Sequence, residues 1–128
     1  MPEISWLTMK RLSPEAHLVV GVVPPEEAGG LKLRAALLSR VATALRLSGL
    51  YAIIDLPERS GSEIRCMLEK SADAERLAKA VSASDAVPAP GCASTRRFVF
   101  DAASVSALQA VLKDVGSETR HRRKRRLF

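Results

Sequence analysis

The residues with the clearest chemistry are the cations at the end of the chain. Residues 117–128 contain six Lys or Arg and one Glu, which gives this segment a net charge of +5. Each cation that neutralises a phosphate releases a condensed counterion, so the segment predicts affinity for a polyanion. A solubilising chain end or, in a eukaryote, a nuclear localisation signal is also consistent with it. The candidate RNA contacts here are Arg120, Arg122, Arg123, Lys124, Arg125 and Arg126.

Two other basic pairs extend this set. Lys10 and Arg11 precede a predicted turn at Ser13-Pro14, and Arg96 and Arg97 begin a predicted strand. Both pairs are candidates for phosphate contacts that add to those of the chain end. An arginine pair at a strand end is equally typical of a solvated edge that prevents strand addition, so both interpretations stay open.

No pattern typical of catalysis accompanies these cations. His17 and His121 lack a neighbouring nucleophile or carboxylate pattern, and Cys66 and Cys92 lack the spacing of metal ligands. His17 is expected to be a half-buried strand residue, and Cys66, in an apolar run, a core residue. We therefore expect a protein that is not an enzyme and that uses no cofactor and no metal.

Length and composition indicate one soluble domain. The chain has 128 residues, of which 47% are hydrophobic and 27% charged, and single cores commonly reach about 150 residues. Residues 1–116 carry 14 cations and 13 acids, a net charge of only +1. No apolar run approaches the roughly 18 residues that span a bilayer, and no signal peptide is recognisable. With two cysteines, we expect reduced thiols and a cytoplasmic location, or a nuclear one in a eukaryote.

Hydrophobic periodicity predicts an alternation of strands and helices. The helix at 72–83 is expected to be capped by Ser71 and the last helix by Asp101, and residues 84–94 are expected to form a loop. The predicted elements are a strand at 16–23, a helix at 26–48, a hairpin of strands at 50–56 and 63–69, a helix at 72–83, a strand at 96–100 and a last helix that Gly116 ends.

This order predicts an α+β fold, a ferredoxin-like βαββαβ sandwich. Such a fold has a four-stranded antiparallel sheet with two helices on one face. An additional C-terminal helix would cover an edge or the open face, and the basic tail would follow it. The predicted organisation is a lead-in at 1–15, the ferredoxin-like domain at 16–116 and the tail at 117–128.

The first helix has an unusually wide apolar face. Leu33 and Ala44 widen the stripe that contains Leu37 to nearly half of the helix surface. A protein partner would explain this width, and Leu33, Leu37 and Ala44 are its candidate interface. Burial under a loop would explain the width equally well.

Aromatic residues are too scarce for base stacking as an RNA-recognition motif performs it. That motif has the same topology and carries aromatic rings on its first and third strands. Here the corresponding segments, AHLVVGVV and EIRCMLE, contain no ring except that of His17. RNA contact is therefore expected through phosphates, loops and the tail.

Several segments together resemble the small ferredoxin-like protein subunit of archaeal and eukaryotic ribonuclease P, from about residue 10 to residue 112. They are Lys10-Arg11 before the apolar first strand, LRAALLSRVATALRLSG, SGSEIRCMLEK with its Arg65-Cys66 pair, and RRFVFDAASVSALQAVL. The turn at 101–104, Asp-Ala-Ala-Ser, departs from the Gly- and Ser-containing turn of that family, so the resemblance gives no RNA contact there. It implies a noncatalytic role in tRNA 5′-end maturation, in which the protein pairs with another protein subunit and stabilises the catalytic RNA.

Two functional hypotheses follow from the sequence. The first is a noncatalytic RNA-binding subunit of a ribonucleoprotein, which the resemblance identifies as ribonuclease P. The second is a ferredoxin-like ligand-sensing or protein-interaction module that dimerises, because this architecture carries many functions. Steep salt dependence of RNA affinity would favour the first, and a salt-insensitive dimer that ignores RNA would favour the second.

Overall fold

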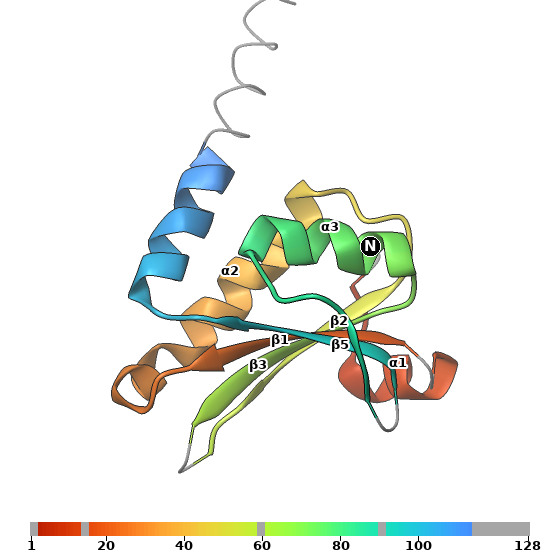
Figure 1. Ribbon diagram of the computed structural model, residues 1–128, viewed down its shortest axis with the longest axis horizontal. Helices are drawn as coiled ribbons and strands as arrows, with labels where there is room; N and C mark the ends of the chain where they lie inside the picture. The colour runs from red at the N-terminus through yellow and green to blue at the C-terminus, as the bar shows by residue number, and fades with distance from the viewer. Residues whose placement is uncertain (1–2, 14–15, 59–60, 90–91, 114–128) are drawn as a thin grey trace, which may run out of the picture.

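A five-stranded sheet with helices on both sides forms the centre of the protein (Figure 1). The computed structural model describes residues 3–13, 16–58, 61–89 and 92–113. The elements in chain order are α1 (Trp6–Leu12), β1 (His17–Val23), the 3₁₀ helix η1 (Pro25–Gly30), α2 (Leu31–Ala44), β2 (Tyr51–Leu56), β3 (Ser62–Leu68), α3 (Ser71–Val81), β4 (Val87–Ala89) and β5 (Cys92–Val99). Residues 102–113 are also helical. The fold is therefore α+β, as the sequence predicts.

The sheet differs from the predicted four-stranded antiparallel one. Its strand order is β2-β3-β1-β5-β4, and β1 pairs antiparallel with β3 but parallel with β5. The additional strand, β4, lies inside the segment expected to be a loop and pairs antiparallel with β5. Pro88 made this segment look like a loop, but an edge strand tolerates proline because one side of it needs no ladder hydrogen bonds. The β4–β5 hairpin reverses the chain, so β5 runs in the same direction as β1.

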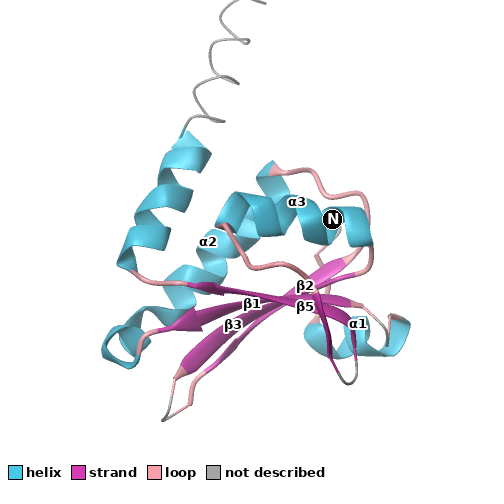
Figure 2. Ribbon diagram, viewed as in Figure 1, coloured by secondary structure: helices cyan, strands magenta, loops and turns pink. Residues whose placement is uncertain are grey.

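The main core lies between the sheet and the layer formed by α2 and α3. Figure 2 shows these two helices and the helix at 102–113 on one side of the strands and α1 on the other. Leu38, Leu77 and Leu108, one from each of the three helices, pack with Val19 of β1 and Phe100 in one apolar cluster. Because aromatic residues are few, aliphatic side chains supply most of this buried surface.

The helix expected at 26–48 is shorter and is divided. Residues 25–30 form η1, and the α-helix begins at Leu31 and ends at Ala44. Two glycines at the end of η1, with their low helix propensity, account for the interruption. The apolar face of α2 also contains a buried cation, Arg34, which is 5% exposed. A buried charged residue on this face is not expected from the periodicity of the segment.

Of the two predicted helix caps, one is confirmed and one is wrong. The backbone N–H of Ser104 donates to Oδ1 of Asp101 at 2.9 Å, as expected for an N-cap. The cap position of α3 is Lys70 rather than Ser71, which is the first residue of the helix, and no side chain caps this end. Gly116, the predicted end of the last helix, lies outside the described residues.

The lead-in contains a short helix that packs on the sheet. Ser5 caps α1 by accepting a hydrogen bond from the backbone N–H of Thr8. Met9, which is completely buried, packs with Ala16 and Ala52 in a second apolar cluster. Ala52 and its neighbour in β2, Tyr51, belong to different clusters, so α1 covers the side of the sheet opposite α2 and α3. Within the ranges described, no helix is long and apolar enough to cross a membrane.

Candidate nucleic-acid interface

Strand register places one arginine on each side of Val20. In the sheet, Val20 of the central strand β1 lies opposite Arg65 of β3 and opposite Arg97 of β5. Paired residues project from the same side of a sheet, so both arginines share the side of Val20. Ala16 packs with Met9 of α1 and lies an even number of positions from Val20. Val20 and the two arginines are therefore on the α1 side of the sheet. The next row along the strands consists of Glu63, Val22 and Val99.

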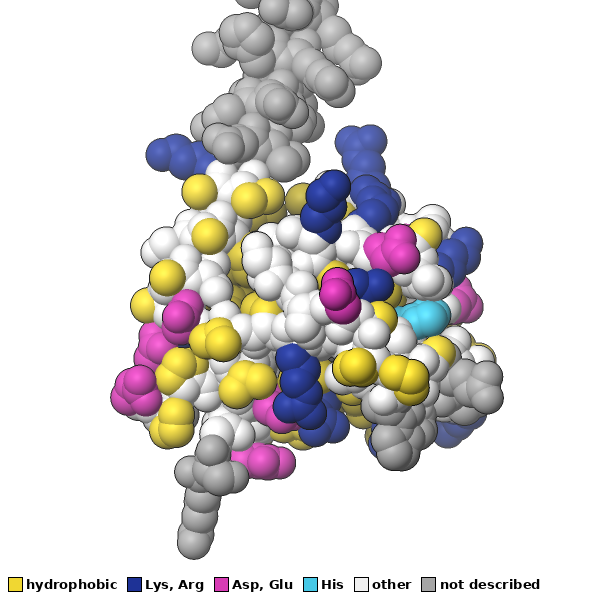
Figure 3. Space-filling view, viewed as in Figure 1, with side chains coloured by type: hydrophobic (Ala, Val, Ile, Leu, Met, Phe, Trp, Pro, Cys, Tyr) yellow, Lys and Arg dark blue, Asp and Glu magenta, His cyan; other side chains and the backbone are white. Residues whose placement is uncertain are grey.

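We call Arg65, Val20, Arg97, Val22 and Val99 the arginine face. In the lower half of Figure 3, dark-blue cationic side chains lie among yellow apolar ones, with magenta acidic side chains next to them. Val99 is 60% exposed, and Val22 is half-buried. The surface therefore combines two arginines, one of them paired with Glu63, with accessible apolar area.

The two arginines differ in how they are held. Nε of Arg65 donates to Oε2 of Glu63 at 2.8 Å, and Nη2 lies 2.8 Å from the same oxygen. Glu63 and Arg65 are two positions apart on β3 and so project from the same side. Arg97 forms no ion pair with any residue that the structure describes, and it is exposed. Arg65 is thus oriented by an internal partner, whereas the charge of Arg97 is uncompensated within the described residues.

The candidates Lys10 and Arg11 also lie on the α1 side. Both are exposed residues in the last turn of α1. The burial of Met9 between α1 and the sheet fixes this helix next to the strands. The structure therefore places Lys10, Arg11 and Arg97, three of the predicted contacts, on the same side of the sheet.

Arg96 does not share that surface. Successive strand residues project from opposite faces, so Arg96 faces α3 while Arg97 faces away from it. Nη2 of Arg96 lies 4.0 Å from Oε1 of Glu75 on α3, and 19% of its side chain is exposed. Its Nε is buried and has no hydrogen-bond partner among the described residues. The two neighbouring arginines that the sequence grouped together therefore have different surroundings.

The predicted partner interface on α2 is wrong for Leu37. Leu37 is 3% exposed and packs in the main core. Ala44 is half-buried, and Leu33 is 58% exposed. Leu37 thus belongs to the contact of α2 with the main core, whereas burial under a loop, the alternative that the sequence left open, does not account for Leu33, which remains exposed. The remaining candidates, Arg120, Arg122, Arg123, Lys124, Arg125 and Arg126, lie outside the described residues.

His17 and Cys66 have the burial that the sequence predicts. His17 is half-buried, and its Nδ1 lies 2.8 Å from Oγ of Ser94 on the neighbouring strand. Cys66 is completely buried, and burial raises the pKa of its thiol. In the described segments, no group of three or more His, Cys, Asp or Glu residues is arranged to hold a metal ion.

Arg65 is the member of the arginine face that sequence reasoning missed. Its segment, EIRCMLE, alternates between buried and half-buried residues along β3. That alternation already assigned Cys66 to the core and so Arg65 to the opposite face. The sequence did not show that Arg97 lies across β1 from Arg65. That arrangement depends on the parallel pairing of β1 with β5, which brings Arg97 to the same row.

Comparison of the chain with protein-family profiles, with curated proteins and with solved structures gives no match.

Proposed function

We propose that this protein is a noncatalytic RNA-binding protein that contacts phosphates through the α1 side of its sheet. The observation that carries the proposal is the position of Arg65 and Arg97 on either side of Val20. Lys10 and Arg11 add two exposed cations on the same side. The basic chain end at 117–128 would supply further contacts on the grounds of its composition.

The net charge of the described residues is low, so local clusters of cations matter more than the charge of the whole body. The 13 cations and 11 acids among the described residues leave a net charge of only +2. Non-specific attraction of the whole body to a polyanion is therefore weak, and local clusters determine where RNA binds. Arg97, whose charge no described acid compensates, contributes more to such a cluster than Arg96 beside Glu75.

We propose the ferredoxin-like plan for the part of the chain from β1 to α3. The order β1, α2, β2, β3, α3 and the neighbouring strands β2-β3-β1 support it. The β4–β5 hairpin takes the place of the single last strand of that plan, and β5 runs parallel to β1. The helix at 102–113 follows as an addition.

The narrower proposal is that the RNA belongs to ribonuclease P. The resemblance of four segments, including SGSEIRCMLEK with Arg65, supports it. Purification from native cells in mild salt, with and without ribonuclease, tests it by identifying the RNA and proteins that copurify. Recovery of ribonuclease P RNA with other subunits is expected, and an RNA-free protein would overturn the assignment.

The direct test of RNA binding compares two substitutions on opposite sides of the molecule. Fluorescence anisotropy of a labelled RNA measures affinity at several salt concentrations. Arg97→Gln should weaken binding and lower the slope of log affinity against log salt by about 0.7, the value for one phosphate contact to a single strand. Lys79→Gln, on the exposed side of α3, should leave both quantities unchanged. Equal effects of the two substitutions would refute the proposed surface.

One observation favours the second candidate function, a module that dimerises. Val87 and Val99, which both lie on the α1 side, are 56% and 60% exposed. Apolar area of this kind also suits a second copy of the chain. Sedimentation velocity at low and high salt distinguishes the two: a dimer that persists in high salt and does not bind RNA would favour the second function.

A further inference from the structure

We infer that the arginine face binds unpaired nucleotides, whose bases stack on the guanidinium groups of Arg65 and Arg97. This inference rests on the proposed RNA-binding function and names the kind of RNA that the surface selects. It differs from phosphate binding alone, because a guanidinium plane can stack on a base and an ammonium group cannot.

The burial of Val20 indicates how the arginine side chains lie. Val20 is only 2% exposed, although it belongs to neither apolar cluster. On the side of the sheet where Val20 lies, α1 packs against Ala16 and Ala52. The direct neighbours of Val20 are Arg65 and Arg97. Leu18 and Val22 flank Val20 along the same face of β1, and the aliphatic stems of the two arginines are long enough to cover the rest of it while their guanidinium groups stay at the surface.

Glu63 orients one of the two guanidinium groups before any ligand binds. Two nitrogens of Arg65 lie within 2.8 Å of one carboxylate oxygen of Glu63. The Arg65 side chain nevertheless remains 36% exposed, so a base can reach it. An oriented planar group loses less conformational entropy when a base stacks on it than a free side chain does.

The arginines occupy positions where the sheet offers no aromatic ring. Phe98 is paired with Gly21, which follows Val20 on β1, so Phe98 projects from the opposite face of the sheet. Phe98, Phe100 and Tyr51 all pack in the main core. The sheet rings that the structure describes therefore face α2 and α3. Neighbouring strands are about 4.8 Å apart, so the backbones of β3 and β5 are separated by about 10 Å across β1. Each arginine is thus a separate platform for one base.

A double helix would not use this surface well. Bases in a duplex are stacked on each other and their faces are inaccessible, whereas unpaired bases in loops and single strands are free to stack on protein groups. Val22 and Val99, which continue the surface along β1 and β5, offer apolar contacts that phosphates do not need. We therefore expect single-stranded RNA to bind more tightly than duplex RNA of the same length.

Substitution of arginine by lysine separates stacking from charge. The full chain is titrated, at one salt concentration and then over a salt series, into an unpaired RNA of about twelve nucleotides and into the corresponding duplex. The single strand contains 2-aminopurine, whose fluorescence changes when its stacking changes. Arg97→Lys is the main variant, because Arg97 forms no ion pair with a described residue, so its replacement removes no internal contact of that kind. Arg65→Lys is the second variant.

Each lysine variant should bind the single strand at least about fivefold more weakly, since stacking of one base contributes about 1–3 kcal/mol. Duplex affinity and the salt slope should stay the same, and the change in 2-aminopurine fluorescence on binding should become smaller. Circular dichroism confirms that each variant is folded.

The outcomes distinguish this inference from the function on which it rests. If the native chain binds neither RNA, the proposed function fails and the inference fails with it. If the native chain binds single strand and duplex equally, or if Arg97→Lys binds as the native chain does, RNA binding stands and the stacking inference is overturned.

Discussion

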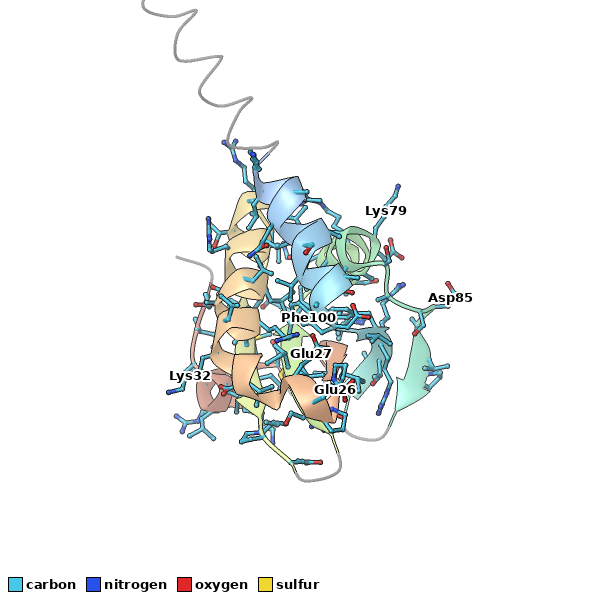
Figure 4. All side chains as sticks on the ribbon, turned by 90° about the vertical axis from the view of Figure 1, so that its left-hand side faces the viewer. Glu26, Glu27, Lys32, Lys79, Asp85 and Phe100 are labelled. Atoms are coloured by element: carbon cyan, nitrogen blue, oxygen red, sulfur yellow. The ribbon has the colours of Figure 1, made fainter. Side chains whose placement is uncertain are left out.

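Nε of Arg34 on α2 donates a hydrogen bond to the carbonyl oxygen of Phe100 at 2.8 Å. The same guanidinium group donates to Oε1 of Glu27 at 3.0 Å and to the carbonyl oxygen of Gly30 at 3.3 Å. It also lies 5.8 Å from the centre of the Phe100 ring, within the range of a cation–π contact. Figure 4 shows Glu27 and Phe100 close together between η1 and the helix at 102–113. The buried side chain of Arg34 thus joins α2 to η1 and to the residue that follows β5.

Replacement of Arg34 should therefore be strongly destabilising. Arg34→Ala leaves the Phe100 carbonyl and the half-buried Glu27 without their donor. Removal of one partner from a buried ion pair typically costs about 3–5 kcal/mol. Urea denaturation of the variant measures the loss of unfolding free energy. Lys32→Ala, an exposed position on the same helix, is the control and should change stability by less than about 0.5 kcal/mol.

Gly21 should not tolerate even one added methyl group. A Cβ atom at this position would lie 2.8 Å from side-chain atoms of both Phe98 and Phe100. The two rings are themselves in contact, with centroids 5.1 Å apart, so neither can move freely. Gly21→Ala should cost about 1–3 kcal/mol, as overpacking does, and should lower the melting temperature. Gly29→Ala is the matched control, because no atom lies within 4 Å of its added Cβ, and an unchanged melting temperature is expected. Equal melting temperatures for both variants would contradict the packing described.

Asp73 should make the stability depend on acidic pH. Burial acts to raise the pKa of Asp73, but hydrogen bonds from the backbone N–H groups of Gly49 and Ser48 outweigh it and lower the pKa. A carboxyl whose pKa is lower in the folded chain stabilises the fold fully above its unfolded pKa of about 4. That contribution is lost as the pH falls through the folded pKa.

The variant Asp73→Asn tests this dependence. At neutral pH the variant should be less stable than the native chain, because the carboxylate that accepts from Gly49 at 2.7 Å has been replaced. The difference in unfolding free energy should narrow as the pH falls below about 4. Urea titrations at a series of pH values measure it, and a difference that stays constant across this range would refute the role of the charge.

Deletion of residues 117–128 should flatten the salt dependence of RNA binding. The segment has six cations, and each phosphate contact to a single strand contributes about 0.7 to the slope. The slope should therefore fall by up to about 4 when the deletion is compared with the full chain by anisotropy. Unchanged binding would show that the chain end does not contact RNA. The test of Arg97 on the sheet does not depend on this result.

Local patterns predicted most elements but not how β5 is placed. The apolar run of β1, the turn residues between β2 and β3, and the stripe of α3 each follow from short-range periodicity. The direction of β5 depends on whether a hairpin precedes it, and β4 has three residues with a proline in the middle. A strand so short has too few positions for alternation to be recognised.

The candidate site was predicted in part for a related reason. The sequence identified Arg97 and the pair Lys10 and Arg11 by charge alone, which does not tell which face of a strand each residue occupies. It therefore joined Arg97 to Arg96, which faces α3, and overlooked Arg65. Arg34 was missed because its neighbours on the helix face are apolar, and only the nearby Glu27 and Phe100 carbonyl explain a cation there.

The parallel pairing of β1 with β5 also determines when the fold can be completed during synthesis. His17 on β1 is paired with Ser94 on β5, 77 positions later. Until β5 has left the ribosome, β1 therefore exposes one unpaired edge of an apolar strand, while β3 already occupies the other. Unpaired strand edges promote aggregation, and pairing over such long separations is slow. A nascent chain that ends before β5 should thus depend on chaperones more than the full chain does.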